Sequence, residues 1–295
     1  MAGRRGITLT EMLAVTGSLA CLLAAVVSAV VGTRDTAART GCAANLGHIG
    51  RAILLYAADH DGRLPDCGAA SSLGGMPDDG RHVPSRASAH GTSAWPRVRA
   101  VGNQANLWLL VREGYALPGI FVCPATADRP SLNSPRDAGV MGFLATDPSS
   151  GALLPEEVRF LRRRAAGRCS YSYQNQFVHP GTHPGVAYTG PATTNRTYHP
   201  LDMAICADRN PYTRVDAVRQ PVVSAEDFPD ANSLNHHGAG QNVLYLAGHV
   251  QWRTTPWCGS WRHDNRRDNI YWPDRGLPDD PLNLPRAPAD SFLVP

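Results

Sequence analysis

An apolar stretch near the N-terminus constrains the fold more than any other feature of the sequence. The 25 residues from Ile7 to Val31 contain one charged residue, Glu11, and no second apolar stretch of this length occurs. Because an α-helix rises about 1.5 Å per residue, the stretch would form a helix about 37 Å long, enough to cross a hydrocarbon layer about 30 Å thick. Arg4 and Arg5 precede it, and basic residues favour the cytoplasmic side. We therefore expect one membrane-spanning helix with a cytoplasmic N-terminus and an exported C-terminal part.

The helical pattern continues beyond the apolar stretch. Apolar residues recur there every three or four positions, which places them on one face of a helix: Cys42, Leu46, Ile49, Ile53 and Tyr56. No Pro occurs before Pro65, so a continuous helix from about residue 8 to about residue 59 is expected. The segment 59–62 matches only the middle of a calcium-binding loop and instead predicts a turn, in which Gly62 adopts the left-handed conformation that ends the helix. The first half of the helix is expected in lipid and the second half against a domain.

Glu11 is unusual inside an apolar helix. A carboxylate at the centre of a membrane span costs about 2.5 to 3.5 kcal/mol on insertion scales, so a charged residue there usually has a function. A secretory signal peptide with a cleavage site at 27–29 (VSA) is the alternative interpretation. However, Glu11 lies where the apolar centre of such a peptide would begin, and the helical pattern continues past the cleavage site. Both observations favour a retained helix.

Residues 4–11, RRGITLTE, resemble the processing motif of type IV prepilins and pseudopilins. In that family a short basic leader ends in Gly, and the mature chain has Glu at its fifth position. The resemblance implies cleavage between Gly6 and Ile7 by a prepilin peptidase and methylation of the new Ile7 amine. It also implies that the Glu11 carboxylate pairs with this amine of its own or, as is usual in the family, a neighbouring subunit. Ile7 replaces the usual Phe, and Thr10 replaces a residue that is commonly aliphatic.

Other segments resemble a planctomycete-type group of these proteins that has a C-terminal signature. Four segments are similar to the helix end and the middle of that group: 42–66, 121–126, 169–177 and 203–211. The signature is a His, nine residues and then Asp-Gly. Here His237 is followed at that spacing by Ala247 and Gly248, so Ala replaces the Asp.

After Pro65, short apolar segments alternate with Gly, Pro, Asp and Asn, which indicates a mixed α and β domain. The predicted elements are helices at 106–115 and 155–165 and strands at 170–177, 203–207, 242–245 and 249–253. The last two strands are joined by a short turn and predict a hairpin. Residues 67–104 predict a loop-rich insertion, and the Pro-rich tail from Trp272 predicts an extended segment.

These elements predict an α+β fold. We expect a pilin-like lollipop, in which the long N-terminal helix packs on an antiparallel β-sheet domain with loop-rich insertions. The expected divisions are a leader peptide at 1–6, a transmembrane half-helix at 7–31, an amphipathic half-helix at 32–62, and an extracytoplasmic domain at 63–295 that ends in the Pro-rich tail.

Seven cysteines occur in the chain, and six of them lie outside the apolar stretch without any CxxC pair. This pattern argues against a zinc site and permits up to three disulfides in an oxidising compartment. The candidate disulfide residues are Cys67, Cys123, Cys169, Cys206 and Cys258. Buried free thiols are the alternative interpretation, and the sequence does not choose between the two.

Three histidines and one acid suggest a metal site or a hydrolase: His236, His237, His249 and Asp208. They lack the HxH or HExxH spacing, and Ala247 occupies the position where an acid would be needed. We therefore expect these histidines to hydrogen-bond the backbone near the hairpin, with no catalytic residue, no metal ligand and no cofactor.

The most consistent function is structural. The sequence predicts a pseudopilin or minor pilin that crosses the inner membrane once and assembles into a type II secretion or type IV pilus-like filament, with its C-terminal domain in the periplasm or at the cell surface. The expected partners are the prepilin peptidase, other pseudopilins or further copies of the chain, the inner-membrane assembly platform and membrane lipid. A net charge of +3 provides no electrostatic surface for nucleic acid, so no nucleic-acid partner is expected.

Two alternatives remain open from the sequence. One is a membrane-anchored extracytoplasmic enzyme that uses the His and Asp residues named above. The other is a binding module for DNA or polysaccharide that uses the basic run 162–164 and a set of aromatic residues: Tyr171, Tyr173, Trp252, Trp257, Trp261 and Trp272.

Overall fold

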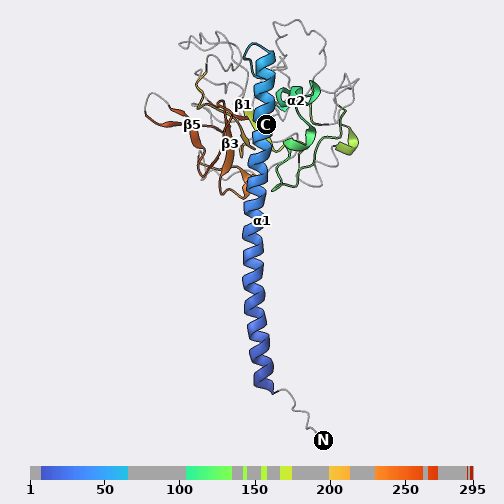
Figure 1. Cartoon of the computed structure of the whole chain (residues 1–295), viewed down its shortest axis with the longest axis vertical. Helices are drawn as coiled ribbons and strands as arrows, with labels where there is room; N and C mark the ends of the chain where they lie inside the picture. Colours follow the sequence, from blue (N-terminus) through green and yellow to red (C-terminus); the bar gives the residue numbers. More distant parts are fainter. Residues whose placement is uncertain are drawn as a thin grey trace.

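A single long helix carries a head domain around its C-terminal half (Figure 1). The computed structural model of the chain describes residues 8–65, 104–134, 142–144, 154–157, 167–174, 199–212, 230–261, 265–271, 291 and 293–294. Several predicted features lie outside these residues: the leader 1–6 with Gly6, then Ile7, Cys67, residues 67–103 of the insertion predicted at 67–104, the Arg run 162–164, and most of the tail from Trp272.

The helix α1 runs without interruption over Leu9–Asp59, 51 residues, as the absence of Pro predicted. Its N-terminus has a capping box: Glu11 donates its backbone N–H to Thr8 Oγ1 at 3.3 Å, and Glu11 Oε2 accepts from the Thr8 backbone N–H at 2.8 Å. Its C-terminus turns at Asp61 and Gly62, whose φ angles are 54° and 79°. The Gly62 N–H donates to the Ala57 carbonyl at 2.7 Å, which confirms the predicted left-handed turn.

The two halves of α1 lie in different environments. From Thr8 to Ala37, every side chain whose exposure is described is exposed, and this half stands clear of the head (Figure 1). The predicted apolar stripe of the second half is buried: Cys42, Leu46, Ile49 and Ile53 are 0% exposed and Tyr56 is 7% exposed. Exposure along α1 therefore changes between Ala37 and Cys42, several residues after the apolar stretch ends at Val31.

The head contains a five-stranded antiparallel sheet with the order β4-β3-β2-β1-β7. Its strands are β1 (Tyr171–Gln174), β2 (Ala204–Asp208), β3 (Gln241–Tyr245), β4 (Val250–Arg253) and β7 (Leu293–Val294). The four predicted strands and the β3–β4 hairpin are confirmed within the described residues. The helix contacts β3 closely at Gly50, where a Cβ atom would come within 2.7 Å of Leu244 Cδ1.

Smaller elements complete the head. The helix α2 (Gln104–Arg112) covers most of the helix predicted at 106–115 but begins and ends earlier, before Gly114 with φ 86°. The 3-10 helices η1 (Pro118–Phe121) and η3 (Leu234–His236) follow in the chain. The strands β5 (Trp257–Trp261) and β6 (Arg267–Asn269) form a second antiparallel sheet that the sequence did not predict. Of the helix predicted at 155–165, the described turn 155–157 is helical and the rest lies outside the described residues.

The cysteines of the described head are buried thiols. Cys123, Cys206 and Cys258 are free, and the Cys169 thiol donates to the Tyr171 carbonyl at 3.5 Å. At these four positions the structure therefore has free thiols, which was the alternative interpretation of the sequence. No disulfide links two described residues.

Candidate functional site

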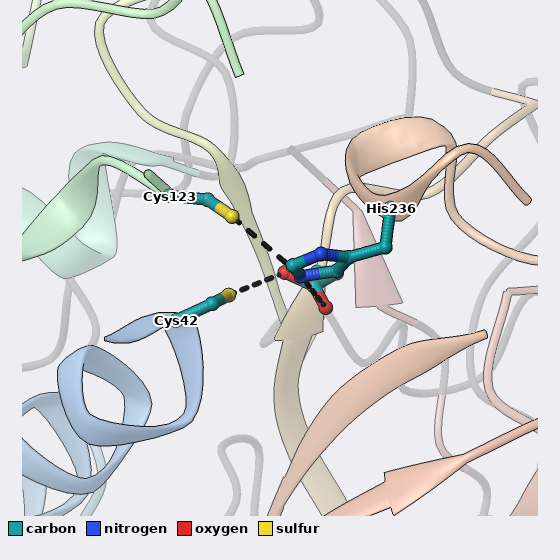
Figure 2. Close-up of side chains that lie close together, drawn as sticks. Cys42, Cys123 and His236 are labelled. Atoms are coloured by element: carbon teal, nitrogen blue, oxygen red, sulfur yellow. Dashed lines mark hydrogen bonds and ion pairs between the residues drawn. The ribbon is translucent and has the colours of Figure 1, made fainter. Parts of the chain in front are cut away.

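Four buried side chains converge where α1 enters the head (Figure 2). They are Cys42 on α1, Cys123 just after η1, Asp208 at the end of β2 and His236 at the end of η3. The two sulfurs, a carboxylate oxygen and a ring nitrogen all lie within 4.8 Å of one another. Cys42, Cys123 and Asp208 are 0% exposed and His236 is 6% exposed. We call these four residues the cysteine cluster.

Local structure fixes each member of the cysteine cluster. Cys42 is the first fully buried residue of α1. The Cys123 backbone N–H donates to Ser170 Oγ at 2.9 Å, which anchors the segment after η1 to the residue before β1. His236 ends a 3-10 turn whose N-cap is Ser233, and the next residue, His237, closes the turn with φ 58°.

The contacts inside the cluster meet at one nitrogen. Cys123 Sγ lies 3.6 Å from His236 Nε2, and Asp208 Oδ2 lies 3.4 Å from the same Nε2. Cys42 Sγ donates to Asp208 Oδ1 at 2.9 Å. In Figure 2 the two thiols point towards the His236 ring from separate parts of the chain.

A second layer of hydrogen bonds holds the cluster. Asp208 Oδ1 accepts from Asn235 Nδ2 at 3.1 Å, and Asp208 Oδ2 accepts from the Asn242 backbone N–H at 2.7 Å. The Tyr171 hydroxyl lies 3.4 Å from Cys42 Sγ. The carboxylate is therefore oriented by groups that do not belong to the cluster.

The buried charges perturb one another strongly. Burial raises the pKa of the Cys42 thiol well above its ordinary value, and hydrogen bonding to Cys42 lowers the pKa of Cys123 to about 6. Burial acts to lower the pKa of His236, but hydrogen bonds to Asp208 and Cys123 outweigh it and raise this pKa to about 9. Cys42 has one proton for two neighbouring acceptors, Asp208 and Cys123, so hydrogen bonds alone satisfy only one of them.

The geometry differs from that of a catalytic triad. In a Cys-His-Asp triad, one ring nitrogen faces the nucleophile and the other faces the orienting acid. Here Cys123 and Asp208 both face His236 Nε2. All the reactive atoms also belong to side chains that are buried. Two sulfurs, an imidazole nitrogen and a carboxylate oxygen are, by contrast, the donor types that bind zinc.

The structure brings together only part of the predicted His and Asp set. His236 and Asp208 meet in the cysteine cluster, whereas His237 is exposed at the end of η3 and His249 is exposed and stacks on Tyr245 at 4.7 Å. The signature residues Ala247 and Gly248 lie in the turn between β3 and β4. Ala247 is exposed in the β3–β4 turn, and Gly248 has φ 92°, where a Cβ atom would come within 2.9 Å of Leu54 Cδ1 on α1.

Among the aromatic residues considered as a binding surface, Trp272 lies outside the described residues, and the five described ones do not gather on one face. Tyr171 and Tyr173 are 0% exposed and belong to the core. Trp252 packs edge-on against His236, with ring centroids 5.4 Å apart. Trp257 and Trp261 are exposed on β5, where Arg267 covers the Trp261 ring at 4.6 Å.

The exposed half of α1 is the second candidate site. It is long and apolar enough to cross a membrane. Glu11 Oε2 accepts two hydrogen bonds of 2.8 Å from Thr8, one from the backbone N–H and one from the hydroxyl. Gly6 and Ile7, the predicted processing residues, lie outside the described residues.

Comparison of the chain with protein-family models, with curated proteins and with solved structures found no match. Function is therefore inferred from the long helix, from Glu11 and from the chemistry of the cysteine cluster.

Proposed function

We propose that the protein is a pseudopilin or minor pilin subunit, anchored in the inner membrane by α1 and assembled through α1 into a type II secretion or type IV pilus-like filament. The observation that carries this proposal is the division of one continuous helix into an exposed apolar half and a half that is packed on a folded head. A pilin-like arrangement needs both halves: one to pack against lipid or other helices, and one to hold the head.

The exposed half of α1 needs a partner for physical reasons. Its large apolar side chains are 43% to 76% exposed: Leu9, Met12, Leu13, Val15, Leu19, Leu22, Leu23, Val26, Val27 and Val30. Fully burying one such side chain contributes about 1.5 to 3 kcal/mol. These residues lie on all sides of the helix, so contact with a single flat surface would leave many of them in water. A bilayer before assembly and a bundle of neighbouring helices after assembly both cover every side.

Glu11 supports assembly through charge pairing. Both hydrogen bonds of its carboxylate use Oε2, and Oε1 accepts none from the described residues. Cleavage after Gly6 would leave a cationic amine on Ile7, which a neighbouring subunit could present to this second oxygen. An ion pair of this kind offsets the cost of two charges in an apolar environment and fixes the axial register of adjacent helices.

The proposal is tested by mass spectrometry of the N-terminus after co-expression with a prepilin peptidase. We expect a mature chain that begins with N-methylated Ile7, and we expect Gly6→Val to block this processing. Gly3→Val is the matched control, because it alters the same leader without changing the cleavage position. A mature chain that begins at Val30 would show ordinary secretion and overturn the proposal.

A further inference from the structure

We infer that Cys42, Cys123, Asp208 and His236 bind one zinc ion in a closed four-ligand site, which fastens the long helix to the head domain. This inference does not depend on filament assembly, because it concerns only residues around the folded head. It rests on the donor set, on the distances between donors and on the chain segments that the donors connect.

The donor set selects the class of metal. Thiolate and imidazole ligands favour zinc and other soft or borderline ions, whereas calcium and magnesium require oxygen ligands. All four donors come from side chains, so no position is left for water or substrate. Closed four-ligand zinc sites are structural, whereas catalytic zinc sites keep an open position.

The two donor distances measured from His236 Nε2 fit a tetrahedral ion, and all four donor atoms lie within 4.8 Å of one another. With zinc–sulfur bonds of about 2.3 Å and zinc–nitrogen or zinc–oxygen bonds of about 2.0 to 2.2 Å, tetrahedral geometry places sulfur and nitrogen about 3.5 Å apart and nitrogen and oxygen about 3.4 Å apart. The observed separations from His236 Nε2 are 3.6 Å to Cys123 Sγ and 3.4 Å to Asp208 Oδ2. Asp208 Oδ2 is therefore the coordinating oxygen, and Oδ1 stays hydrogen-bonded to Asn235.

The convergence on one nitrogen also favours a metal over a hydrogen-bond network. A single ring nitrogen has either one proton or one lone pair, so His236 Nε2 forms a good hydrogen bond with Cys123 or with Asp208 but not with both. An ion at the centre uses that lone pair once and contacts all four donors at the same time. The Asn242 N–H and the Tyr171 hydroxyl then act as outer groups that orient Asp208 and Cys42.

The site connects segments that are distant in the sequence. Cys42 and Asp208 are 166 residues apart, and Cys123 and His236 are 113 residues apart. One ion would join α1, the segment after η1, the end of β2 and the end of η3. Because the ligands approach one another only in the folded head, the free energy of zinc binding adds to the free energy of folding.

The test is the zinc content of the full-length chain, purified in detergent without a polyhistidine tag from cells grown with zinc. Inductively coupled plasma mass spectrometry should find close to one zinc ion per chain. Cys42→Ser and Cys123→Ser should each weaken zinc binding by more than about tenfold, since loss of an outer-shell partner alone has an effect of this size. Cys258→Ser is the matched control, because Cys258 is an equally buried thiol outside the cluster and its loss should leave the zinc content unchanged.

A measurement on the unaltered chain covers the case in which a variant fails to fold. X-ray absorption at the zinc edge should show two sulfur ligands at about 2.3 Å and two nitrogen or oxygen ligands at about 2.0 to 2.2 Å. The inference is overturned by a chain without stoichiometric zinc, or by a zinc shell that contains no sulfur. Equal zinc content in the Cys42→Ser and Cys258→Ser variants, or a Cys42–Cys123 disulfide in unreduced peptides of the exported protein, would also overturn it.

Discussion

Two glycines in the packed half of α1 should respond differently to the same substitution. Replacing Gly by Ala inside a helix stabilises it by about 0.8 to 1.0 kcal/mol, because Gly loses more backbone freedom on folding. At Gly47 no atom lies within 4 Å of the added Cβ apart from its chain neighbours and the backbone of the helix itself, so Gly47→Ala should gain this amount of stability in full. At Gly50 the added Cβ would lie 2.7 Å from Leu244 Cδ1, which is closer than real contacts allow.

The cost at Gly50 follows from the position of Leu244. This side chain is 0% exposed and belongs to the main core, so it can move only by displacing packed neighbours. Overpacking of this kind costs about 1 to 3 kcal/mol. After subtraction of the helix gain, Gly50→Ala should leave stability unchanged or lower it by up to about 2 kcal/mol. The two variants should therefore differ by about 1 to 3 kcal/mol, although their positions are one helical turn apart.

The assay is urea unfolding of the full-length chain in detergent micelles, followed by near-ultraviolet circular dichroism. Buried aromatic residues such as Trp108, Tyr171 and Tyr173 report on the packing of the head. The comparison of transition midpoints is valid if the dependence of the free energy of unfolding on urea is the same in both variants. If Gly50→Ala stabilised the head as much as Gly47→Ala, the close packing of α1 on β3 would be refuted.

Two further predictions concern α1. Leu46→Ala should destabilise the head by about 2 to 5 kcal/mol because Leu46 is 0% exposed, whereas Leu55→Ala, at 58% exposure on the same helix, should stay within about 0.5 kcal/mol in the same urea assay; equal losses would contradict the burial of this face. Glu11→Ala should insert in the membrane at least as well as the unaltered chain but yield few filaments in a sedimentation assay. Thr8→Ala, which breaks the capping box and keeps the carboxylate, should still assemble, and normal assembly of Glu11→Ala would contradict the pairing role.

The elements that the sequence predicted well are those with local signals. The limits of α1 followed from the absence of Pro before Pro65 and from the turn at Gly62, and the buried face followed from spacings of three and four residues. The β3–β4 hairpin followed from two apolar segments around a short turn. The strands β6 (Arg267–Asn269) and β7 (Leu293–Val294) are only three and two residues long, so neither contains a pattern that distinguishes it from a loop.

The cysteine cluster was predictable only in part, because the sequence suggested His236 and Asp208 as candidates for a metal site but connected neither of them to a cysteine. Its members have no spacing in common, and each had a satisfactory local explanation. Cys42 fitted the apolar stripe as a small hydrophobic residue, Cys123 was a candidate for a disulfide, and His236 was a candidate for a backbone hydrogen bond. Asp208 ends a buried strand, and only the order of the strands places it beside α1. The residue types were visible in the sequence, but only the long-range topology of the fold brings them together.

The position of Cys42 has a mechanical consequence. The exposed half of α1 extends roughly 45 Å away from the head, and only the other half of the helix is attached to the head. A force along the helix axis acts on all contacts between the buried face of α1 and the head at the same time, so the load is distributed over many contacts. Sideways force instead bends the helix away from the head and loads first the contacts nearest the exposed half, which are Arg39 over the Trp252 ring at 3.9 Å and then Cys42, the first fully buried side chain. A coordination bond at Cys42 would stop this separation close to where it begins, which apolar contacts that fail one after another cannot do.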